Sequence, residues 1–408
     1  REAISYITEK RINMAARVLK HMMPTVLKTN SRVDPLGIDT LPPLFQWQLC
    51  TQHENCYQSA YRIVVMESGG RVVWDSGKVL SDQQIQIPYS GEALRSMTRY
   101  LHCGDKAVLH TYYPNMKRYT DYELNRLNGG MSSNLYYGDW NSPAGSCPPE
   151  GSAFNATCFV YRILTIMRQI ADVLKQDADA ARYQAAAEQM RQNLNTRFFN
   201  KTQMLYHTEI PVGFRQTPTV LPLAFGIAPE KLRGGIAVSL ASQIHTHDHD
   251  HLATGCMGLK YLAPALTEYG QAETAYAIVS QTDCPSWGYW LSKGATTCWE
   301  TWDTDSRSYN HFYFGTIDDW FYQYLAGIRP LTAGYKTFRI RPYPCGALTE
   351  VEAQVESPYG TIRVHWTLTD GVFTLEASIP ANTTAEIILP DGTAKQTGSG
   401  SYQYEVRL

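Results

Sequence analysis

The chain has 408 residues and a net charge of -2, with 44% hydrophobic and 18% charged residues. At roughly 150 residues per domain this length predicts two or three domains. The balanced charge excludes nucleic-acid and polybasic membrane-surface binding as functions carried by the overall field, and it favours small or neutral partners. Aromatic residues are numerous, with 27 Tyr and 9 Trp against 12 Phe. Their rings combine an apolar face with a polar edge, which suits sites for hydroxylated ligands such as sugars.

Residues 1–32 form a basic leader without the continuous apolar stretch of a signal peptide. Met14, Val18 and Met22 share a helical face that Pro24 interrupts. One interpretation is a membrane-surface or targeting helix. The other, which we favour because chain termini are commonly disordered, is a poorly ordered leader.

The nine cysteines form an odd set without a CxxC pair. We therefore predict neither a zinc module nor a complete disulfide framework. Mostly free thiols favour a reducing, cytoplasmic compartment. No part of the sequence predicts a cofactor, a metal or a membrane span.

Short alternating runs at 44–49, 59–66 and 71–74 predict strands. Ser68-Gly69-Gly70 supplies a hairpin turn between the last two runs. We expect residues 33–102 to form part of an N-terminal β-sandwich.

After Gly104 the hydrophobic period changes to 3.6, and the pattern predicts a helical domain over residues 105–330. The helices are expected near 106–127, 153–175, 178–197, 229–243, 252–268, 271–281 and 316–326. Strands return at 337–341, 350–355, 361–368, 372–379 and 385–389, which predicts a second β-sandwich over residues 334–408. The order β, all-α, β favours segregated domains over a mixed sheet.

Five of the nine tryptophans, at 287, 290, 299, 302 and 320, lie in one short stretch that also contains Glu300, Asp303 and Asp305. Sugar hydrolysis needs this mixture of rings that stack on a pyranose and a carboxylate that activates water or protonates a leaving oxygen. An alternative stays open, because Thr297 and Glu300 also match the Ser/Thr-x-x-Glu pattern of a helix capping box.

The run His245-Thr-His-Asp-His-Asp-His251 could bind a metal. Alternation directs all four imidazoles to one side only on a strand, and this run falls between two predicted helices, so we favour a polar loop. The sequence contains no His-Glu-x-x-His, no GxGxxG, no GxxxxGK[ST] and no GxSxG motif, which removes the common signals for zinc-peptidase, nucleotide and α/β-hydrolase sites.

Two further residues occur in notable surroundings. Asp139 belongs to Tyr137-Gly-Asp-Trp140, and His311 follows Asn310 at the start of an aromatic run. Alone, Asp139 would be interpreted as a turn or N-cap aspartate, and His311 as a satisfied core histidine.

In chain order these stretches resemble the α-L-rhamnosidases of glycoside hydrolase family seventy-eight from about residue 33 to the end. Gly294-Ala-Thr-Thr-Cys-Trp-Glu300 is the most specific piece. The others are Asp34-Pro-Leu-Gly-Ile-Asp39, Phe45-Gln-Trp-Gln-Leu49, Trp74-Asp-Ser-Gly-Lys-Val79, Tyr137-Gly-Asp-Trp140, His251-Leu-Ala-Thr-Gly255, Pro285-Ser-Trp-Gly-Tyr289, Asn310-His311 and Leu325-Ala-Gly-Ile328.

The resemblance implies a multidomain fold in which a central α/α toroid, an (α/α)6-barrel, is flanked by antiparallel β-sandwiches. It also implies inverting hydrolysis of terminal α-L-rhamnose from glycosides or polysaccharides. Glu300 matches the family's general base. Asp139, Trp140 and His311 match motifs that line the sugar pocket, and Trp287, Trp299 and Trp302 are the expected stacking partners.

The sequence departs from the family pattern at one point. The family's general-acid motif opens with Asp-Cys-Pro ahead of the helix that leads to Tyr-Gly-Asp-Trp, whereas this chain passes from Thr98-Arg-Tyr100 almost directly into that helix. Asp283-Cys284-Pro285 has a different context, and we interpret it as a coincidence. Asp139, Asp303 or Asp305 could replace the acid, but no spacing argument places any of them opposite Glu300.

Three functional hypotheses follow. The first is a shortened rhamnosidase-type hydrolase with weak or no activity, and the second is a non-catalytic carbohydrate-binding remnant. The third, an enzyme acting on uronides, is disfavoured because residues 285–303 contain only one basic residue, Lys293. An incomplete barrel would also expose apolar helix faces and favour self-association.

Overall fold

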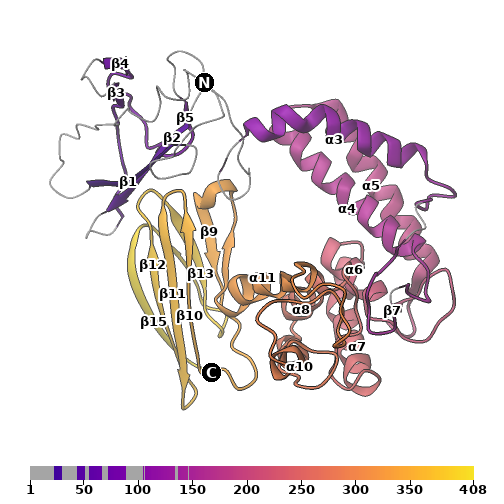
Figure 1. Cartoon of the computed structure of the whole chain (residues 1–408). Helices are drawn as coiled ribbons and strands as arrows, with labels where there is room; N and C mark the ends of the chain where they lie inside the picture. Colours follow the sequence, from indigo (N-terminus) through magenta and orange to yellow (C-terminus); the bar gives the residue numbers. More distant parts are fainter. Residues whose placement is uncertain are drawn as a thin grey trace. The chain divides into compact units, whose positions relative to one another are not determined.

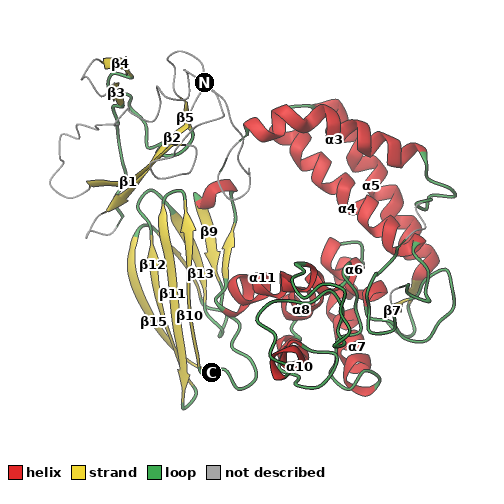
Figure 2. Ribbon diagram, in the orientation of Figure 1, coloured by secondary structure: helices red, strands yellow, loops and turns green. Residues whose placement is uncertain are grey.

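A computed structural model describes residues 23–29, 44–50, 55–66, 72–88, 104, 106–133, 137–145 and 147–408 (Figure 1). Contacts between residues divide the chain into two compact units. Unit 1 comprises Arg1–Thr111, Leu325–Pro344 and Leu348–Leu408, and unit 2 comprises Tyr112–Tyr324 and Cys345–Ala347. The expected order of β, helical and β regions along the chain is confirmed (Figure 2).

The N-terminal part of unit 1 is a small β structure. Its strands are β1 (Met23–Thr29), β2 (Leu44–Cys50), β3 (Val64–Met66), β4 (Val72–Asp75) and β5 (Ile87–Pro88), in a sheet of order β1-β2-β5 and a separate β3-β4 pair. Phe45, Trp47, Ile63 and Ile87 form its buried core. The predicted strand at 59–66 is shorter than expected, and β1 lies upstream of the predicted boundary at residue 33. The rest of the predicted leader, the Ser68-Gly69-Gly70 turn and the junction at 98–103 lie outside the described residues.

The C-terminal part of unit 1 is a sandwich of two four-stranded sheets, of order β10-β11-β12-β15 and β14-β13-β9-β8. The strands are β8 (Ile328–Pro330), β9 (Thr337–Ile340), β10 (Glu350–Ser357), β11 (Gly360–Thr369), β12 (Val372–Ile379), β13 (Thr384–Ile388), β14 (Ala394–Thr397) and β15 (Gly400–Arg407). Alternate residues of β11 and β12, among them Val364, Trp366, Phe373 and Leu375, point into the core and are fully buried. Strands β8, β14 and β15 were not predicted.

Polar side chains join the N-terminal β structure to the sandwich within unit 1. The amide of Asn382 donates to Gln84 Oε1 at 2.6 Å, and its Oδ1 accepts from the Gln58 main-chain N–H at 2.8 Å. Gln48 donates to the Ser357 carbonyl at 3.3 Å. Gln48, Gln84 and Asn382 are buried, and these bonds satisfy polar groups that burial would otherwise leave unpaired.

Unit 2 is helical. Its elements are α3 (Ala107–Asn125, which begins in unit 1), α4 (Ala153–Val173), α5 (Asp177–Phe198), α6 (Thr217–Phe225), η1 (Glu230–Leu232), α7 (Arg233–Thr246), α8 (Leu259–Glu268), α9 (Ala272–Val279), α10 (Trp287–Ser292), η2 (Tyr313–Ile317), α11 (Asp318–Trp320) and η3 (Phe321–Leu325), with a short β6-β7 hairpin (Phe199–Asn200 and Leu205–Tyr206). The helix predicted from residue 252 begins only at Leu259, and α6 and α10 were not predicted.

Long helices pack at one end of unit 2. Helix α4 lies along α5, and α6 contacts both α4 and α8. Tyr113 and Lys117 of α3 reach the Asp179 carboxylate of α5 at 2.8 and 2.6 Å. Tyr119 and Tyr122 of α3 are about half exposed. Among the described helices, none combines the length and apolar character needed to cross a bilayer.

Candidate active site

Glu300 lies on an irregular loop of unit 2. Residues 293–312 are all described and contain neither helix nor strand. Two stretches of this loop run side by side, because the Glu300 N–H donates to the Ser308 carbonyl at 2.9 Å and the His311 N–H to the Cys298 carbonyl at 2.8 Å. The capping-box interpretation of Thr297 and Glu300 is therefore wrong, since no helix begins there.

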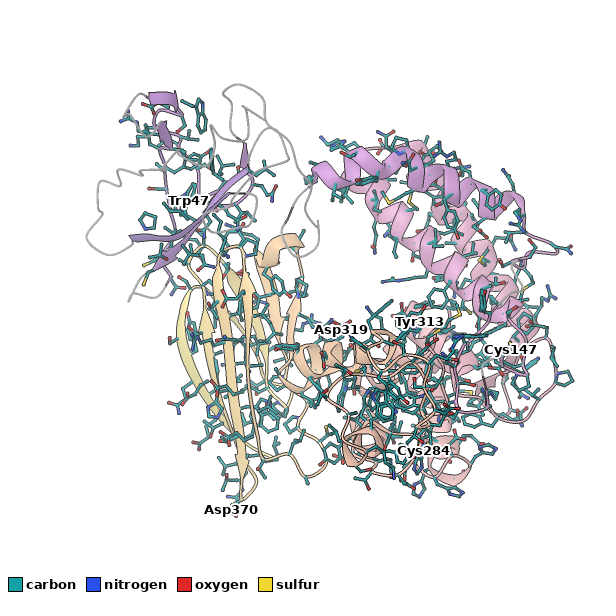
Figure 3. All side chains as sticks on the ribbon, viewed as in Figure 1. Trp47, Cys147, Cys284, Tyr313, Asp319 and Asp370 are labelled. Atoms are coloured by element: carbon teal, nitrogen blue, oxygen red, sulfur yellow. The ribbon has the colours of Figure 1, made fainter. Side chains whose placement is uncertain are left out.

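Aromatic rings support this loop from within. Trp302 stacks between Trp290 and Phe314, with both centroid separations at 4.5 Å. Trp299 packs on Trp290 and meets the edge of Tyr309. Figure 3 shows side chains crowded around the segments that carry Cys284 and Tyr313. Stacked, buried rings thus stabilise this loop, which lacks the regular backbone hydrogen bonds of a helix or strand.

The predicted stacking tryptophans differ in exposure. Trp299 and Trp302 are buried against other rings. Trp287 is half-buried, and its indole N–H donates to the Phe314 carbonyl at 3.0 Å. Trp140 is half-buried too, and Tyr137 meets it edge to face. Trp140 and Trp287 thus keep more open ring surface than Trp299 and Trp302.

The Glu300 carboxylate is close to the surface. Its side chain is 13% exposed, and Oε1 forms an ion pair with Arg307, whose side chain is 70% exposed. Arg307 was not predicted as a site residue, because it stands seven positions away in a loop whose path the sequence does not reveal. The guanidinium holds the carboxylate in one orientation.

The main chain of Glu300 is fixed from two sides. The Ser306 hydroxyl accepts from the N–H groups of Glu300 and Thr301, both at 3.2 Å. Asn141 donates from Nδ2 to the Glu300 carbonyl at 3.1 Å. The loop that bears the candidate base is therefore bonded to the turn that follows Trp140.

Asp139 is completely buried, and both of its carboxylate oxygens accept hydrogen bonds from the protein. Oδ2 accepts from Thr217 Oγ1 at 2.5 Å and the Gly255 N–H at 2.7 Å, and Oδ1 accepts from the N–H groups of Met257 and Gly258, each at 3.0 Å. Burial raises the pKa of Asp139, and these four hydrogen bonds oppose that rise. The carboxylate binds the chain entering α8 to the Tyr-Gly-Asp-Trp turn.

Glycine is required opposite this turn. A Cβ at Gly255 would lie 2.3 Å from the carbonyl oxygens of both Asp139 and Trp140. The Cys256 N–H then donates to the Trp140 carbonyl at 2.8 Å. Two motifs singled out in the sequence, residues 137–140 and 251–255, are thereby in direct contact.

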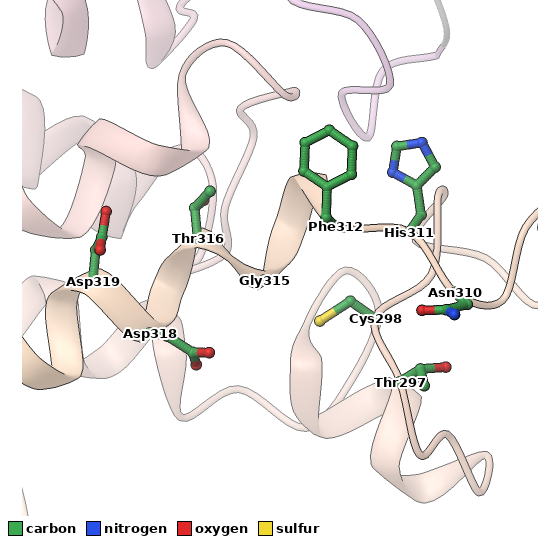
Figure 4. A pocket seen from close by; sticks show the side chains of 9 residues that line it. All are labelled: Thr297, Cys298, Asn310, His311, Phe312, Gly315, Thr316, Asp318 and Asp319. Carbon is green, nitrogen blue, oxygen red and sulfur yellow. The ribbon is translucent and has the colours of Figure 1, made fainter. Parts of the chain in front are cut away.

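His311 lies at a pocket of about 630 Å³, together with Thr297, Cys298, Asn310, Phe312, Gly315, Thr316, Asp318 and Asp319. The His311 and Phe312 rings stand side by side in Figure 4, nearly parallel with centroids 5.4 Å apart. Burial, and then the nearby Asp318, raises the pKa of the Cys298 thiol. Glu300 does not line this pocket, but it is two residues from Cys298.

The histidine run begins in the last turn of α7 and continues into the turn that follows it. Three of the four imidazoles pair with different carboxylates: His245 bonds to Asp250, His247 to Asp248, and His251 Nε2 to Asp283 Oδ1 at 2.9 Å. Across the described part of the chain, no three His, Cys, Asp or Glu side chains are arranged to hold a metal ion. Asp283, from the Asp-Cys-Pro triplet, is hydrogen-bonded to His251.

Three family models match the chain along most of its length. A bacterial alpha-L-rhamnosidase 6 hairpin glycosidase domain matches residues 93–325, a bacterial alpha-L-rhamnosidase C-terminal domain matches residues 327–403, and a Rha78A-like N-terminal immunoglobulin domain matches residues 24–102. The fold and site thus define a six-hairpin glycosidase domain flanked by β domains, as expected.

Individual relatives carry the same description. An alpha-L-rhamnosidase of Streptomyces avermitilis is 31% identical over 332 residues, which is 74% of this chain and 31% of that protein. One of Alteromonas sp. is 30% identical over 71% of this chain and 33% of its own length. The chain belongs to the bacterial α-L-rhamnosidase family, and it spans about a third of the length of these curated relatives.

Two solved structures of alpha-L-rhamnosidases are also similar to this chain. The alpha-L-rhamnosidase from Dictyoglumus thermophilum superposes with a TM-score of 0.71 at 28% identity, covering 76% of this chain and 38% of that chain. The Streptomyces avermitilis alpha-L-rhamnosidase complexed with L-rhamnose gives a TM-score of 0.68 at 29% identity, covering 76% and 32%.

Proposed function

We propose that this protein is a glycoside hydrolase that removes terminal α-L-rhamnose from glycosides, with Glu300 as the general base that activates water. The carrying observation is the Glu300 carboxylate, partly exposed, oriented by Arg307 and held on a tryptophan-supported loop. Membership of the rhamnosidase family and the likeness to a structure complexed with L-rhamnose support the substrate.

An inverting mechanism needs a second carboxyl about 6.5–9.5 Å from the first to protonate the leaving oxygen. Asp139 is bonded on both oxygens inside the protein and is unsuited to that role. The sequence lacks the family's acid motif, and the absence of an acid removes a contribution of order 10² to 10⁴ in rate. We therefore propose slow hydrolysis that favours substrates with good leaving groups.

Release of p-nitrophenol from its α-L-rhamnoside tests this function. We expect Glu300→Gln to lower kcat by about 10²-fold or more, and proton NMR of the first product to show the inverted β-anomer. The matched control is Glu352→Gln, an exposed carboxylate on strand β10 of the sandwich. Equal turnover by wild type and Glu300→Gln would remove Glu300 from its role.

The second candidate is a carbohydrate-binding protein without catalysis, and the missing acid motif favours it. Calorimetry with L-rhamnose separates the two proposals. Heat of binding at millimolar sugar without any p-nitrophenol release would select this candidate. No heat together with no turnover would exclude both.

A further inference from the structure

The turn that follows Trp140 contacts the backbone of the candidate base. Asn141 is 4% exposed and has a left-handed φ of 58°, which directs its side chain toward the 300 loop. Its amide donates to the Glu300 carbonyl at 3.1 Å. This bond therefore joins the turn directly to the peptide group of the candidate base.

A buried ion pair fixes the same turn. Arg215 Nη2 donates to Ser142 Oγ at 3.0 Å, and its Nε lies 3.1 Å from Glu150 Oε2. The Glu150 side chain has no exposed surface, and that of Arg215 is 14% exposed. The turn closes on itself through the Gly145 N–H, which donates to the Ser142 carbonyl at 2.9 Å.

Arg215 is the cationic partner of the buried Glu150 carboxylate. Both Glu150 oxygens lack an aligned hydrogen-bond donor, so Arg215 is their compensating charge. Burial raises the pKa of Glu150, and the Arg215 charge opposes that rise. An isolated buried pair of this kind adds little stability compared with apolar packing, which suggests that it serves geometry.

We propose that the Glu150–Arg215 ion pair positions Glu300, acting through Ser142 and Asn141. The pair holds the 141–145 turn, and the turn holds the Glu300 peptide, so that the carboxylate starts from a fixed main chain. Only the catalytic consequence rests on the proposed function. The mechanical link itself can be tested without turnover.

Hydrogen exchange measured by mass spectrometry tests the link. In Asn141→Gly, which keeps the left-handed backbone and removes the donor, amides of residues 298–302 should exchange about tenfold faster. Ser142→Ala and Glu150→Gln should accelerate the same peptide to a smaller extent. The matched control is Asn382→Gly, which changes a buried asparagine with φ of 62° in unit 1 and should leave this peptide unchanged.

Unchanged exchange in Asn141→Gly would overturn the proposal. Faster exchange in Asn141→Gly alone, with Ser142→Ala and Glu150→Gln at the wild-type rate, would overturn the part assigned to the ion pair. Either result leaves the proposed function standing, because exchange does not depend on catalysis.

Kinetics then tests whether the link serves Glu300. We expect Asn141→Gly to lower kcat about tenfold with little change in KM, because a displaced base weakens the transition state more than binding. In a Glu300→Gln background the same substitution should cause no further loss, since the two act as one unit. An equal loss in both backgrounds would show a general structural effect and overturn the positioning role.

Discussion

The C-terminal sandwich and the 293–312 loop are both ordered around buried tryptophans, but by different means. In the sandwich, Trp366 sits on a regular strand whose neighbours alternate between core and surface, and its indole N–H donates to the Leu325 carbonyl at 2.8 Å. In the loop, Trp302 has no strand beside it and is held by stacked rings and by the Trp290 indole N–H, which donates to its carbonyl at 3.2 Å. Period-2 alternation builds the first region, and individual contacts build the second.

The difference shows where precision can be placed. A sheet fixes the direction of every side chain at once, through its register. A loop can turn a carboxylate such as Glu300 to any direction, but each bond that holds it there must be supplied separately. Arg307, Ser306 and Asn141 supply three such bonds.

Replacing either tryptophan by alanine should strongly destabilise its own region. Trp366→Ala and Trp302→Ala should each cost about 3–5 kcal/mol of unfolding free energy, because each leaves a large cavity. Hydrogen exchange should show the loss in the sandwich for Trp366→Ala, and in the loop for Trp302→Ala. Binding of L-rhamnose should fall only in Trp302→Ala. A matching fall in Trp366→Ala would contradict the separation.

Asp139→Asn tests a junction made of single contacts. The amide would turn an N–H group toward at least one buried donor now bonded to the carboxylate, with an expected cost of about 3 kcal/mol. Denaturant unfolding of unit 2 measures it. Asp172→Asn, an exposed carboxylate of α4 that pairs with Arg168 four residues away, is the control and should cost less than about 1 kcal/mol. A negligible cost in Asp139→Asn would show that the turn has no need of a charge.

The His251–Asp283 pair predicts the smallest effect, a dependence on pH. Burial lowers the pKa of His251, but its bonds to Asp283 and to the His249 carbonyl outweigh burial and raise it above 6.5. The bond to His251 lowers the pKa of Asp283 below 3.8. The pair therefore contributes most to the free energy of unfolding at pH values between the pKa of Asp283 and the pKa of His251. Its contribution is lost as pH rises through the His251 pKa or falls through the Asp283 pKa.

Proton NMR of the His251 ring measures this dependence. We expect a midpoint above 6.5 in the wild type and a lower midpoint in Asp283→Asn. An unchanged His251 midpoint in Asp283→Asn would show that the pair does not form in solution.

The fold was largely predictable because periodicity reports burial. Strands β10 to β13 and helices α4 and α5 follow their patterns to within a few residues. Helix α6 was not predicted because Pro218 and Pro222 interrupt a uniformly apolar sequence, although the first proline is tolerated at a helix start. Strand β15 alternates at intermediate burial, which gives a weaker signal.

The site was predictable in its parts but not in its geometry. Glu300 and Asp139 were identified through motifs. The hydrogen bonds that Asp139 accepts from Gly255 and that Asn141 donates to Glu300, however, join positions more than a hundred residues apart. Arg215 and Glu150 gave no local signal, because their pairing exists only once the segment that precedes α6 and the loop that carries Glu150 lie together. The roles of the predicted site residues in catalysis and binding remain predictions.

The connection between Gln84 and Asn382 has a consequence for synthesis of the chain on the ribosome. The helical unit is nearly continuous in sequence, whereas unit 1 is assembled from segments on either side of it. At 5–20 residues per second, the sandwich strands leave the ribosome on the order of ten seconds after the last helices. Throughout that interval the N-terminal strands lack the surface on which Gln48, Gln58 and Gln84 are satisfied. Until the sandwich strands emerge, strands β1 to β5 are thus exposed to aggregation or chaperone capture.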